Sequence, residues 1–255
     1  MTVATVAGHP WIEVDGLPNA RELGGIPLAG GGRVRHAALY RSGTPHAVTA
    51  RGLDTAVGEL RIATVLDLRA ASEAERIGAG PFASDPRVTR YVLELGGDPA
   101  EAPFAEFDAG DDLMGAIYLA ILDASADALR RTLEAIAAAA SAPLLFHCHA
   151  GQDRTGVVAA TLLGLLGASE DDIVADYLLT QTWLLTRPPE VRQARQEAIA
   201  RLGVRDGSLD PAERSIRRWL AAVRERWGSA EAMALAVGVP SATIATLRRE
   251  LVDPA

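Results

Sequence analysis

The sequence predicts an α/β fold in which helices flank a central, mainly parallel sheet, followed by a helical C-terminal third. Short runs rich in branched apolar residues, ATVLDL (63–68) and PLLFHC (143–148), are typical of buried parallel strands. Helical patterns alternate with these runs along the chain. Beyond residue 185 the sequence is helical and charged without a strand signal, so we expect only helices there.

The N-terminal part supplies most of the expected strands. In chain order, the expected elements are β-like pieces at 11–14, 33–34 and 38–41, a helix at about 49–60, strands at 63–68 and 88–95, and helices at 112–123 and 126–139. Thr49 is placed to cap the first of these helices. The short pieces before it predict an irregular hairpin, because that region is rich in Gly and Pro.

The chain after the strand at 143–148 is expected to be helical. The segment 155–166 is apolar on nearly all sides, which predicts a central helix against the sheet, and Gly167 ends it. Ser169 offers an N-cap for the next helix, with carboxylates in its first turn. Further helix starts are indicated at Asp210, Ser229 and Ser241.

Length and charge limit the classes of function. At 255 residues the chain can bury a large core, and we expect one domain over residues 1–255. It carries 25 basic and 33 acidic residues, a net charge of −8, so neither nucleic-acid binding nor stable membrane association is expected. All the basic residues are arginines. An anionic ligand must therefore be held by a local site.

Cys148 is the one cysteine of the chain, which excludes an internal disulfide and a multi-cysteine metal site. A free thiol is easiest to keep in a reducing compartment, so we expect a cytoplasmic protein. The N-terminus shows no secretory signal pattern, although secretion by a route without a signal stays open. No apolar stretch reaches the ~18 residues of a membrane span.

The segment FHCHAGQDRTGVV (146–158) carries the strongest chemical signal. A strand, a loop over 148–154 and a helix from Thr155 direct backbone N–H groups at one point, which makes an anion site. Gly151 lets the backbone approach a ligand closely, and Arg154 supplies a planar fork for two phosphate oxygens. The same positive environment favours the thiolate form of Cys148. The loop is therefore expected to bind an anion and to activate the nucleophile.

Each residue of this loop has an expected role. Cys148 attacks a bound phosphoryl group and forms a phosphocysteine that water hydrolyses, without a cofactor or a metal. Asp153 is the nearest acid for the leaving oxygen. His147 is expected to tie the loop to the scaffold. The expected substrate- and phosphate-binding residues are His149, Ala150, Gly151, Gln152, Arg154 and Thr155, where the Thr155 hydroxyl can also hydrogen-bond the sulfur.

The spacing C-x5-R followed by Thr155, preceded by His147 and set between strand and helix, predicts a cysteine-dependent phosphatase. The simplest alternative is a structural, buried Cys148. Two other classes compete with the phosphatase: a rhodanese-like sulfurtransferase, whose loop also begins with cysteine, and a phospho-ligand-binding module that has lost turnover. The intact set Cys148, Asp153 and Arg154 argues against that last class.

For several charged residues outside the loop, the sequence allows two different roles. Asp67 and Arg69 follow the strand ATVLDL and are either a second acid and a second anion contact, or a local ion pair. Arg21 either tethers the N-terminal segment, which we favour, or approaches the site. Asp111 and Asp112 are favoured as helix caps over acids.

The helical C-terminal third offers two further features. Residues 182–227 are a candidate lid, with Pro188-Pro189 and the glycines at 203–207 as hinges. Within it, an apolar stripe favours core packing over a ligand site. The stripe consists of Leu209, Ile216, Trp219, Leu220, Val223 and Trp227. The basic cluster Arg217, Arg218, Arg224 and Arg226 is interspersed with acids and is expected to be solvated, with an acidic substrate segment as the alternative.

The sequence also resembles a known family. HCHAGQDRTG is similar to the HC-x-AG-K-DRTG loop of the bacterial tyrosine/serine phosphatases typified by mycobacterial tyrosine phosphatase B. Other segments resemble further signatures of that family, and together they cover about residues 12–252. These segments are NARELGG (19–25), LYRSG (39–43), LDLRAASEAE (66–75) and DYLLT (176–180).

The resemblance implies a phosphatase-type α/β fold with helical insertions that lid the site. It implies that Cys148 is the nucleophile, that Arg154 binds phosphate and that Asp153 is the general acid. Family members act on phosphotyrosine, and some also on phosphoserine, phosphothreonine or phosphoinositides. Gln152 stands where the family has lysine. Since a point charge beside the phosphate is lost, we expect phosphotyrosine to be preferred over phosphoinositides.

Overall fold

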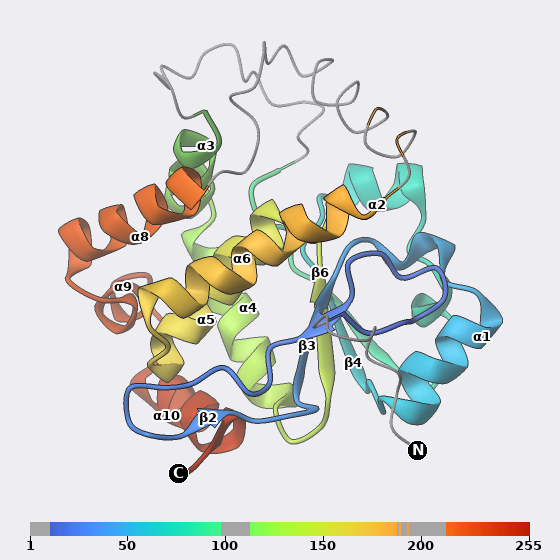
Figure 1. The fold of residues 1–255 in the computed structure, drawn as a ribbon, viewed down its shortest axis with the longest axis horizontal. Helices are drawn as coiled ribbons and strands as arrows, with labels where there is room; N and C mark the ends of the chain where they lie inside the picture. Colours follow the sequence, from blue (N-terminus) through green and yellow to red (C-terminus); the bar gives the residue numbers. More distant parts are fainter. Residues whose placement is uncertain (1–10, 98–112, 188, 190–192, 194–212) are drawn as a thin grey trace.

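The computed structural model describes residues 11–97, 113–187, 189, 193 and 213–255, and in this part of the chain a five-stranded sheet forms the centre (Figure 1). Its strands are β1 (Arg21–Glu22), β3 (Leu39–Ser42), β4 (Thr64–Asp67), β5 (Thr89–Val92) and β6 (Leu144–His147). Their order across the sheet is β1-β3-β6-β4-β5. β1 is antiparallel to β3 and the other pairings are parallel, so the predicted mainly parallel sheet is confirmed.

Helices occupy most of the remaining described chain. They are α1 (Ala50–Leu53), α2 (Ala71–Ile77), α3 (Leu113–Ala124), α4 (Ala126–Ala139), α5 (Asp153–Leu166), α6 (Glu170–Leu185), α8 (Glu213–Trp227), α9 (Ala230–Ala236) and α10 (Ser241–Leu251). Short 3-10 turns form at η1 (Pro45–Ala47) and η3 (Pro81–Ala83), and the π-helical turn η2 (Asp54–Glu59) prolongs α1. The predicted caps are present at Thr49, Ser169 and Ser229.

The three central strands β3, β6 and β4 are buried on both faces, as is typical of a parallel sheet, whereas the edge strand β5 is mostly exposed. On β6, Leu144 and Phe146 belong to the larger core, which contains the apolar residues of α5. Leu145 between them belongs to a smaller core with Val65 and Phe82 on the opposite face. Figure 1 shows α4, α5 and α6 on one side of the sheet and α1 on the other. The predicted central helix at 155–166 is thus confirmed as α5, whose residues are almost all buried.

The C-terminal helices form an outer layer: α8 packs against α3 and α6, and α9 and α10 pack against α5. The predicted apolar stripe is core, because Ile216, Trp219, Leu220 and Val223 are buried. Its Leu209 lies outside the described residues, as does half of the candidate lid at 182–227. The described C-terminal part of that segment, α8, contributes these four buried side chains to the larger core.

Two of the local predictions for the C-terminal region are wrong. Val252–Asp253 forms a strand, β7, which pairs antiparallel with β2 (Arg33–Val34) although no strand was expected in this region. A two-residue strand is too short to leave an alternating pattern. Ser241 is the first residue of α10 and Pro240 stands at the cap position. Asp111, Asp112 and the expected helix start at Asp210 lie outside the described residues. In the described part, no helix is long and apolar enough to cross a membrane.

Candidate active site

The loop that carries Cys148 leaves the C-terminal end of β6, which lies between β3 and β4. Ligands of open parallel sheets gather at this edge. α5 begins at Asp153, two residues earlier than the predicted start at Thr155. The first N–H groups of a helix have no partner within it, and a carboxylate there interacts favourably with the helix dipole. Asp153 and Arg154 are therefore fixed on the first turn of α5, not on a loop.

The carbonyl groups of residues 149–151 point away from the centre of the loop into the scaffold. The carbonyl of His149 accepts from the Thr44 N–H (2.8 Å), that of Ala150 from Asn19 Nδ2 (3.2 Å), and that of Gly151 from Arg41 Nη2 (2.8 Å) and Asn19 Nδ2 (3.4 Å). In a trans peptide the N–H points opposite to the carbonyl. The N–H groups of residues 150–152 are therefore turned to the inner side of the loop, an arrangement that is able to bind an anion.

Gly151 makes this loop shape feasible. Its φ is +71°, in the left-handed region that favours glycine. A Cβ at this position would lie 2.3 Å from the Ser42 carbonyl oxygen. The loop thus packs directly on the backbone that follows β3, and any side chain would displace it.

Arg154 is held by a buried carboxylate. Arg154 Nη2 donates to Glu73 Oε1 at 3.0 Å and Nη1 donates to Glu73 Oε2, which gives a bidentate pair. Burial alone lowers the pKa of a guanidinium, but the hydrogen bond to Glu73 and the negative charges of Cys148, Glu73 and Asp153 raise the pKa of Arg154 above its usual value. Arg154 is therefore a permanent cation, and its guanidinium lies within electrostatic reach of the Cys148 sulfur.

Glu73 connects this pair to α2. Its Oε2 also accepts a hydrogen bond from the Ala70 N–H at the start of that helix, at 3.2 Å. Sequence reasoning missed Glu73 as a partner of Arg154, although it lies in the segment LDLRAASEAE. The one available signal was its position shortly after β4, at the edge of the sheet where Cys148 also lies.

Asp153 contacts a tyrosine that the sequence did not single out. Tyr118 on α3 donates a hydrogen bond to Asp153 Oδ1 at 2.5 Å, and the hydroxyl groups of Tyr118 and Tyr177 are also hydrogen-bonded. Asp153 itself is half-buried. No local pattern marks Tyr118, since it appears as one apolar residue of an apolar helix.

Asp67 and Arg69 form the local ion pair that the sequence left as one of two alternatives. Arg69 donates to both oxygens of Asp67, at 2.9 and 2.7 Å, and Arg90 donates to Asp67 Oδ2 at 2.7 Å. Asp67 and Arg69 are fully buried. Burial raises the pKa of Asp67, but the hydrogen bonds to the two arginines and the charge of His147 lower it well below its usual value. Such a carboxylate is a poor proton donor.

Arg21 tethers the N-terminal segment to α6, the alternative that the sequence favoured. Arg21 Nε donates to Asp176 Oδ1 at 2.9 Å, and Arg41 Nη1 donates to the other oxygen of the same carboxylate. Since Arg41 also holds the Gly151 carbonyl, α6 is connected through two buried arginines to the loop. NARELGG, LYRSG and DYLLT, which lie far apart in the sequence, meet in this network.

The two histidines that flank Cys148 differ in burial. His147 is fully buried; its Nδ1 lies 3.1 Å from the Cys148 carbonyl and its Nε2 lies 3.9 Å from Asp67 Oδ1. Burial lowers the pKa of His147 to about 4, against the charge of Asp67, so the ring is neutral at pH 7. Its contacts fit the expected anchoring role. His149, in contrast, is exposed.

Gln152 and Thr155 are also fully buried. Gln152 stands at the N-cap position of α5, where its carbonyl accepts from the Gly156 N–H at 2.6 Å. The Thr155 hydroxyl has no hydrogen-bond partner among the described residues. This buried hydroxyl lies on the first turn of α5, next to Arg154.

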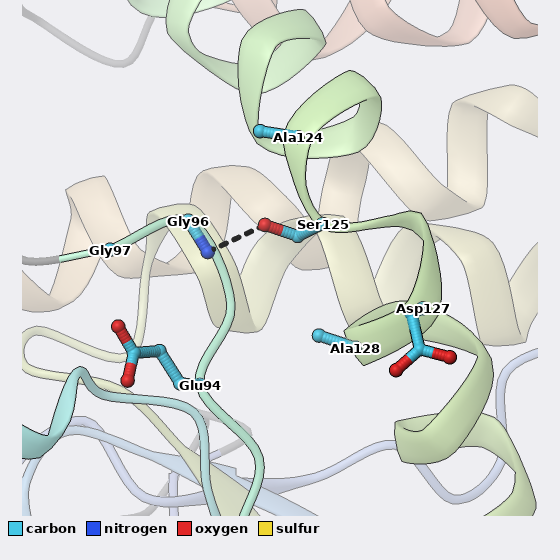
Figure 2. Close-up of a pocket in the computed structure, with 7 residues that line it drawn as sticks. All are labelled: Glu94, Gly96, Gly97, Ala124, Ser125, Asp127 and Ala128. Atoms are coloured by element: carbon cyan, nitrogen blue, oxygen red, sulfur yellow. Dashed lines mark hydrogen bonds between the residues drawn. The ribbon is translucent and has the colours of Figure 1, made fainter.

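A separate hollow lies between the segment after β5 and the turn that joins α3 and α4 (Figure 2). The Gly96 N–H donates to Ser125 Oγ at 2.9 Å across one end of it. Glu94 and Asp127 also line it, and none of the residues 146–158 does. The hollow is thus distinct from the site at the cysteine loop.

The fold and the site define a class: an α/β protein with a strand–loop–helix unit that is able to bind an anion and that holds a cysteine beside a buried arginine. Comparison with known protein families then identifies the family within this class. The chain belongs to the tyrosine phosphatase family, whose model matches residues 12–253. The resemblance seen in the sequence is thereby confirmed, and the protein is a phosphatase of this family.

Several named relatives agree with this assignment. A Cupriavidus necator protein named "Putative tyrosine-protein phosphatase" is 34% identical over 213 residues, which are 82% of this chain and 75% of the relative. The "Triple specificity protein phosphatase PtpB" of Mycobacterium tuberculosis is 31% identical over 193 residues, 65% of this chain and 67% of the relative.

Among solved structures, the core catalytic domain of the PP-IP phosphatase SIW14 of S. cerevisiae aligns with 68% of this chain and 95% of its own. The identity is 16% and the TM-score 0.36. A likeness of this size carries no argument about function, so the family assignment rests on the sequence relatives.

Proposed function

We propose that this chain is a cysteine-dependent, metal-independent protein tyrosine phosphatase that works through a phosphocysteine intermediate. The observation that carries the proposal is the orientation of the loop: its carbonyl groups at 149–151 are bound by the scaffold, so its N–H groups face the position beside Cys148 and Arg154. This arrangement fits a phosphate dianion above the sulfur.

In the first step, the Cys148 thiolate attacks phosphorus in line with the leaving oxygen. The S–P bond forms while the P–O bond to the tyrosyl oxygen breaks, and Asp153 transfers its proton to that oxygen. Arg154 and the loop N–H groups hold the three other phosphate oxygens. Glu73 fixes the orientation of the Arg154 fork, which increases the charge stabilisation of the transition state.

In the second step, water attacks the phosphocysteine and gives a proton to Asp153 as the S–P bond breaks. Inorganic phosphate leaves and the thiolate of Cys148 is restored. Thr155 has a buried hydroxyl whose proton is not used elsewhere in the described part, and it is available to the departing sulfur. In this assignment Asp67 and Arg69 shape the scaffold instead of taking part in proton transfer.

Phosphotyrosine proteins are the proposed substrates, with phosphoserine and phosphothreonine as secondary ones. The family assignment supports the first, and the name of the mycobacterial relative, a triple specificity protein phosphatase, supports wider use. Gln152 supplies no charge where the resembling family has lysine. Loss of this positive charge weakens the binding of a multiply anionic phosphoinositide more than the binding of a phosphotyrosine peptide.

The test is phosphate release from p-nitrophenyl phosphate and from a phosphotyrosine peptide in the presence of EDTA, by the wild type and Cys148→Ser. The wild type should turn over both substrates, and the variant should lose roughly 10⁴-fold or more in kcat, as expected for loss of a nucleophile. Thiosulfate sulfur transfer is measured in parallel. Activity that needs added metal, survives in Cys148→Ser, or appears only with thiosulfate would contradict the proposal.

A further inference from the structure

Tyr118 is a buried polar group that neither catalytic step uses. It lies on α3, is fully buried, and donates its hydroxyl proton to Asp153 Oδ1 at 2.5 Å. Its position is therefore set by packing within the core, while its one polar atom reaches the proposed acid.

A second tyrosine fixes the first. Tyr177 on α6 meets Tyr118 edge to face, with ring centroids 6.2 Å apart and an interplanar angle of 71°, and the two hydroxyl groups share a short hydrogen bond. The ring of Tyr177 lies against Gly156 of α5, where a Cβ would be 2.9 Å from it. Three helices thus hold the tyrosine pair beside Asp153.

The proton count gives this chain of hydrogen bonds a direction. A phenol has one proton, and that of Tyr118 is used on Asp153. The hydrogen bond between the two hydroxyl groups must then be donated by Tyr177. Burial, followed by the charge of Asp153, raises the pKa of Tyr118 well above its usual value. Tyr118 is therefore a neutral hydrogen-bond donor at pH 7.

We propose that Tyr118 is the positioning residue for proton transfer: it holds Oδ1 of Asp153, so that Oδ2 is the oxygen that exchanges protons with substrate and water. This inference rests on the proposed function, in which Asp153 is the general acid. In the first step the proton on Oδ2 goes to the leaving oxygen. In the second step a proton of the attacking water returns to Oδ2. Oδ1 accepts from Tyr118 in both, and the donor stabilises the carboxylate that exists between them.

The decisive variant is Tyr118→Phe, which removes the hydroxyl and keeps the buried ring. We expect kcat/KM for a phosphotyrosine peptide to fall about 10-fold, a part of the 10²–10⁴-fold that a general acid contributes. For p-nitrophenyl phosphate, whose leaving group hardly needs a proton, kcat/KM should change less than 2-fold (~0.4 kcal/mol). The matched control is Tyr91→Phe on β5, where the same hydroxyl is lost from a side chain that is 45% exposed; both kcat/KM values should be unchanged.

A double-mutant cycle separates positioning from packing. If Tyr118 acts through Asp153, then Tyr118→Phe has no further effect on phosphotyrosine hydrolysis in an Asp153→Asn background. Tyr177→Phe, which leaves the Tyr118 hydroxyl in place, should show the same selectivity between substrates with a smaller loss. Thermal unfolding of each variant checks that it is folded.

The outcomes distinguish two failures. If Asp153→Asn alone slows both substrates equally, the proposed role of Asp153 fails. If Asp153→Asn is selective but Tyr118→Phe has no effect, slows both substrates equally, or still slows the reaction in the Asp153→Asn background, then the positioning role of Tyr118 is overturned.

Discussion

Gly151 is the residue on which the shape of the cysteine loop depends most directly. Its positive φ and its contact with the Ser42 carbonyl oxygen are independent constraints, one on the backbone and one on space. Gly167, which ends α5, shares the first constraint but not the second: its φ is +96°, and a Cβ there would meet no described atom within 4 Å other than those of its chain neighbours. The two glycines therefore allow strain and steric clash to be separated.

We predict that Gly151→Ala lowers kcat/KM for p-nitrophenyl phosphate by about 10²-fold or more, because the loop must move away from Ser42 and a displacement of ~1 Å in an active site has an effect of this size. Gly167→Ala should keep the wild-type kcat/KM and lose only about 1 kcal/mol of unfolding free energy to the left-handed backbone. Steady-state kinetics and urea denaturation of both variants measure this. Equal activity in the two would show that the close approach to Ser42 is unimportant.

For single residues, sequence reasoning identified those that lie close together in the sequence, in and next to one loop. Cys148, Asp153 and Arg154 were proposed from the C-x5-R pattern, and the structure brings them together at the start of α5. Glu73 and Tyr118 were missed because their contacts with the loop span 81 and 35 positions of sequence. A partner chosen by the fold leaves no periodic pattern at its own position.

Among the elements, α6 has the clearest role in supporting the loop. Its Ser169 cap was predicted, but its function was not, because Asp176 appears in the sequence as one of several acids on a charged helix. In the structure Asp176 is buried and shared by Arg21 and Arg41, and Arg41 continues to the Gly151 carbonyl. Asp176 of α6 therefore fixes the outer side of the cysteine loop indirectly, through Arg41 and the Gly151 carbonyl.

We predict that Asp176→Asn destabilises the protein by about 3 kcal/mol or more, because it leaves two buried guanidinium groups without a counter-charge. Urea denaturation measures the loss. The control on the same helix is Asp171→Asn, which breaks an ion pair to Arg217 at 2.8 Å with a carboxylate that is 84% exposed. Surface pairs of this kind contribute little, so the control should unfold as the wild type does. Similar stability of the two variants would contradict the conclusion that Asp176 of α6 supports the fold by holding Arg21 and Arg41.

For the whole molecule, hydrophobic periodicity predicted the sheet and helix layers, but neither the order of the strands nor the pairing of β2 with β7. The apolar runs gave β4 and β6, because both faces of these strands are buried. The strand signal at 88–95 also gave β5, which lies at the edge of the sheet and is mostly exposed. The order of the strands, with β6 inserted between β3 and β4, has no local signature. The pairing of β2 with β7 joins residues more than 200 positions apart, through strands of two residues each.

Burial of ionisable groups beside the sheet also makes the stability of the whole fold depend on pH. His147 is fully buried, and this burial lowers its pKa from 6.5 to about 4. Between these two values the unfolded chain binds a proton that the folded protein does not. Stability should therefore fall as the pH decreases from about 6.5 to about 4. Below this window, the lowered pKa values of Asp67 and Asp176 cause a further loss of stability as these carboxylates are protonated.

The contribution of His147 is testable by substitution. A pKa difference from 6.5 to about 4 corresponds to roughly 3 kcal/mol between the ends of the window. His147→Asn keeps a side-chain donor for the Cys148 carbonyl but does not titrate there, so its unfolding free energy should decrease much less than that of the wild type between pH 6.5 and 4. His36→Asn removes a histidine that is 58% exposed and should retain the wild-type slope. Urea denaturation at several pH values gives the three slopes. If His147→Asn lost stability as steeply as the wild type, another buried group would have to account for the pH dependence.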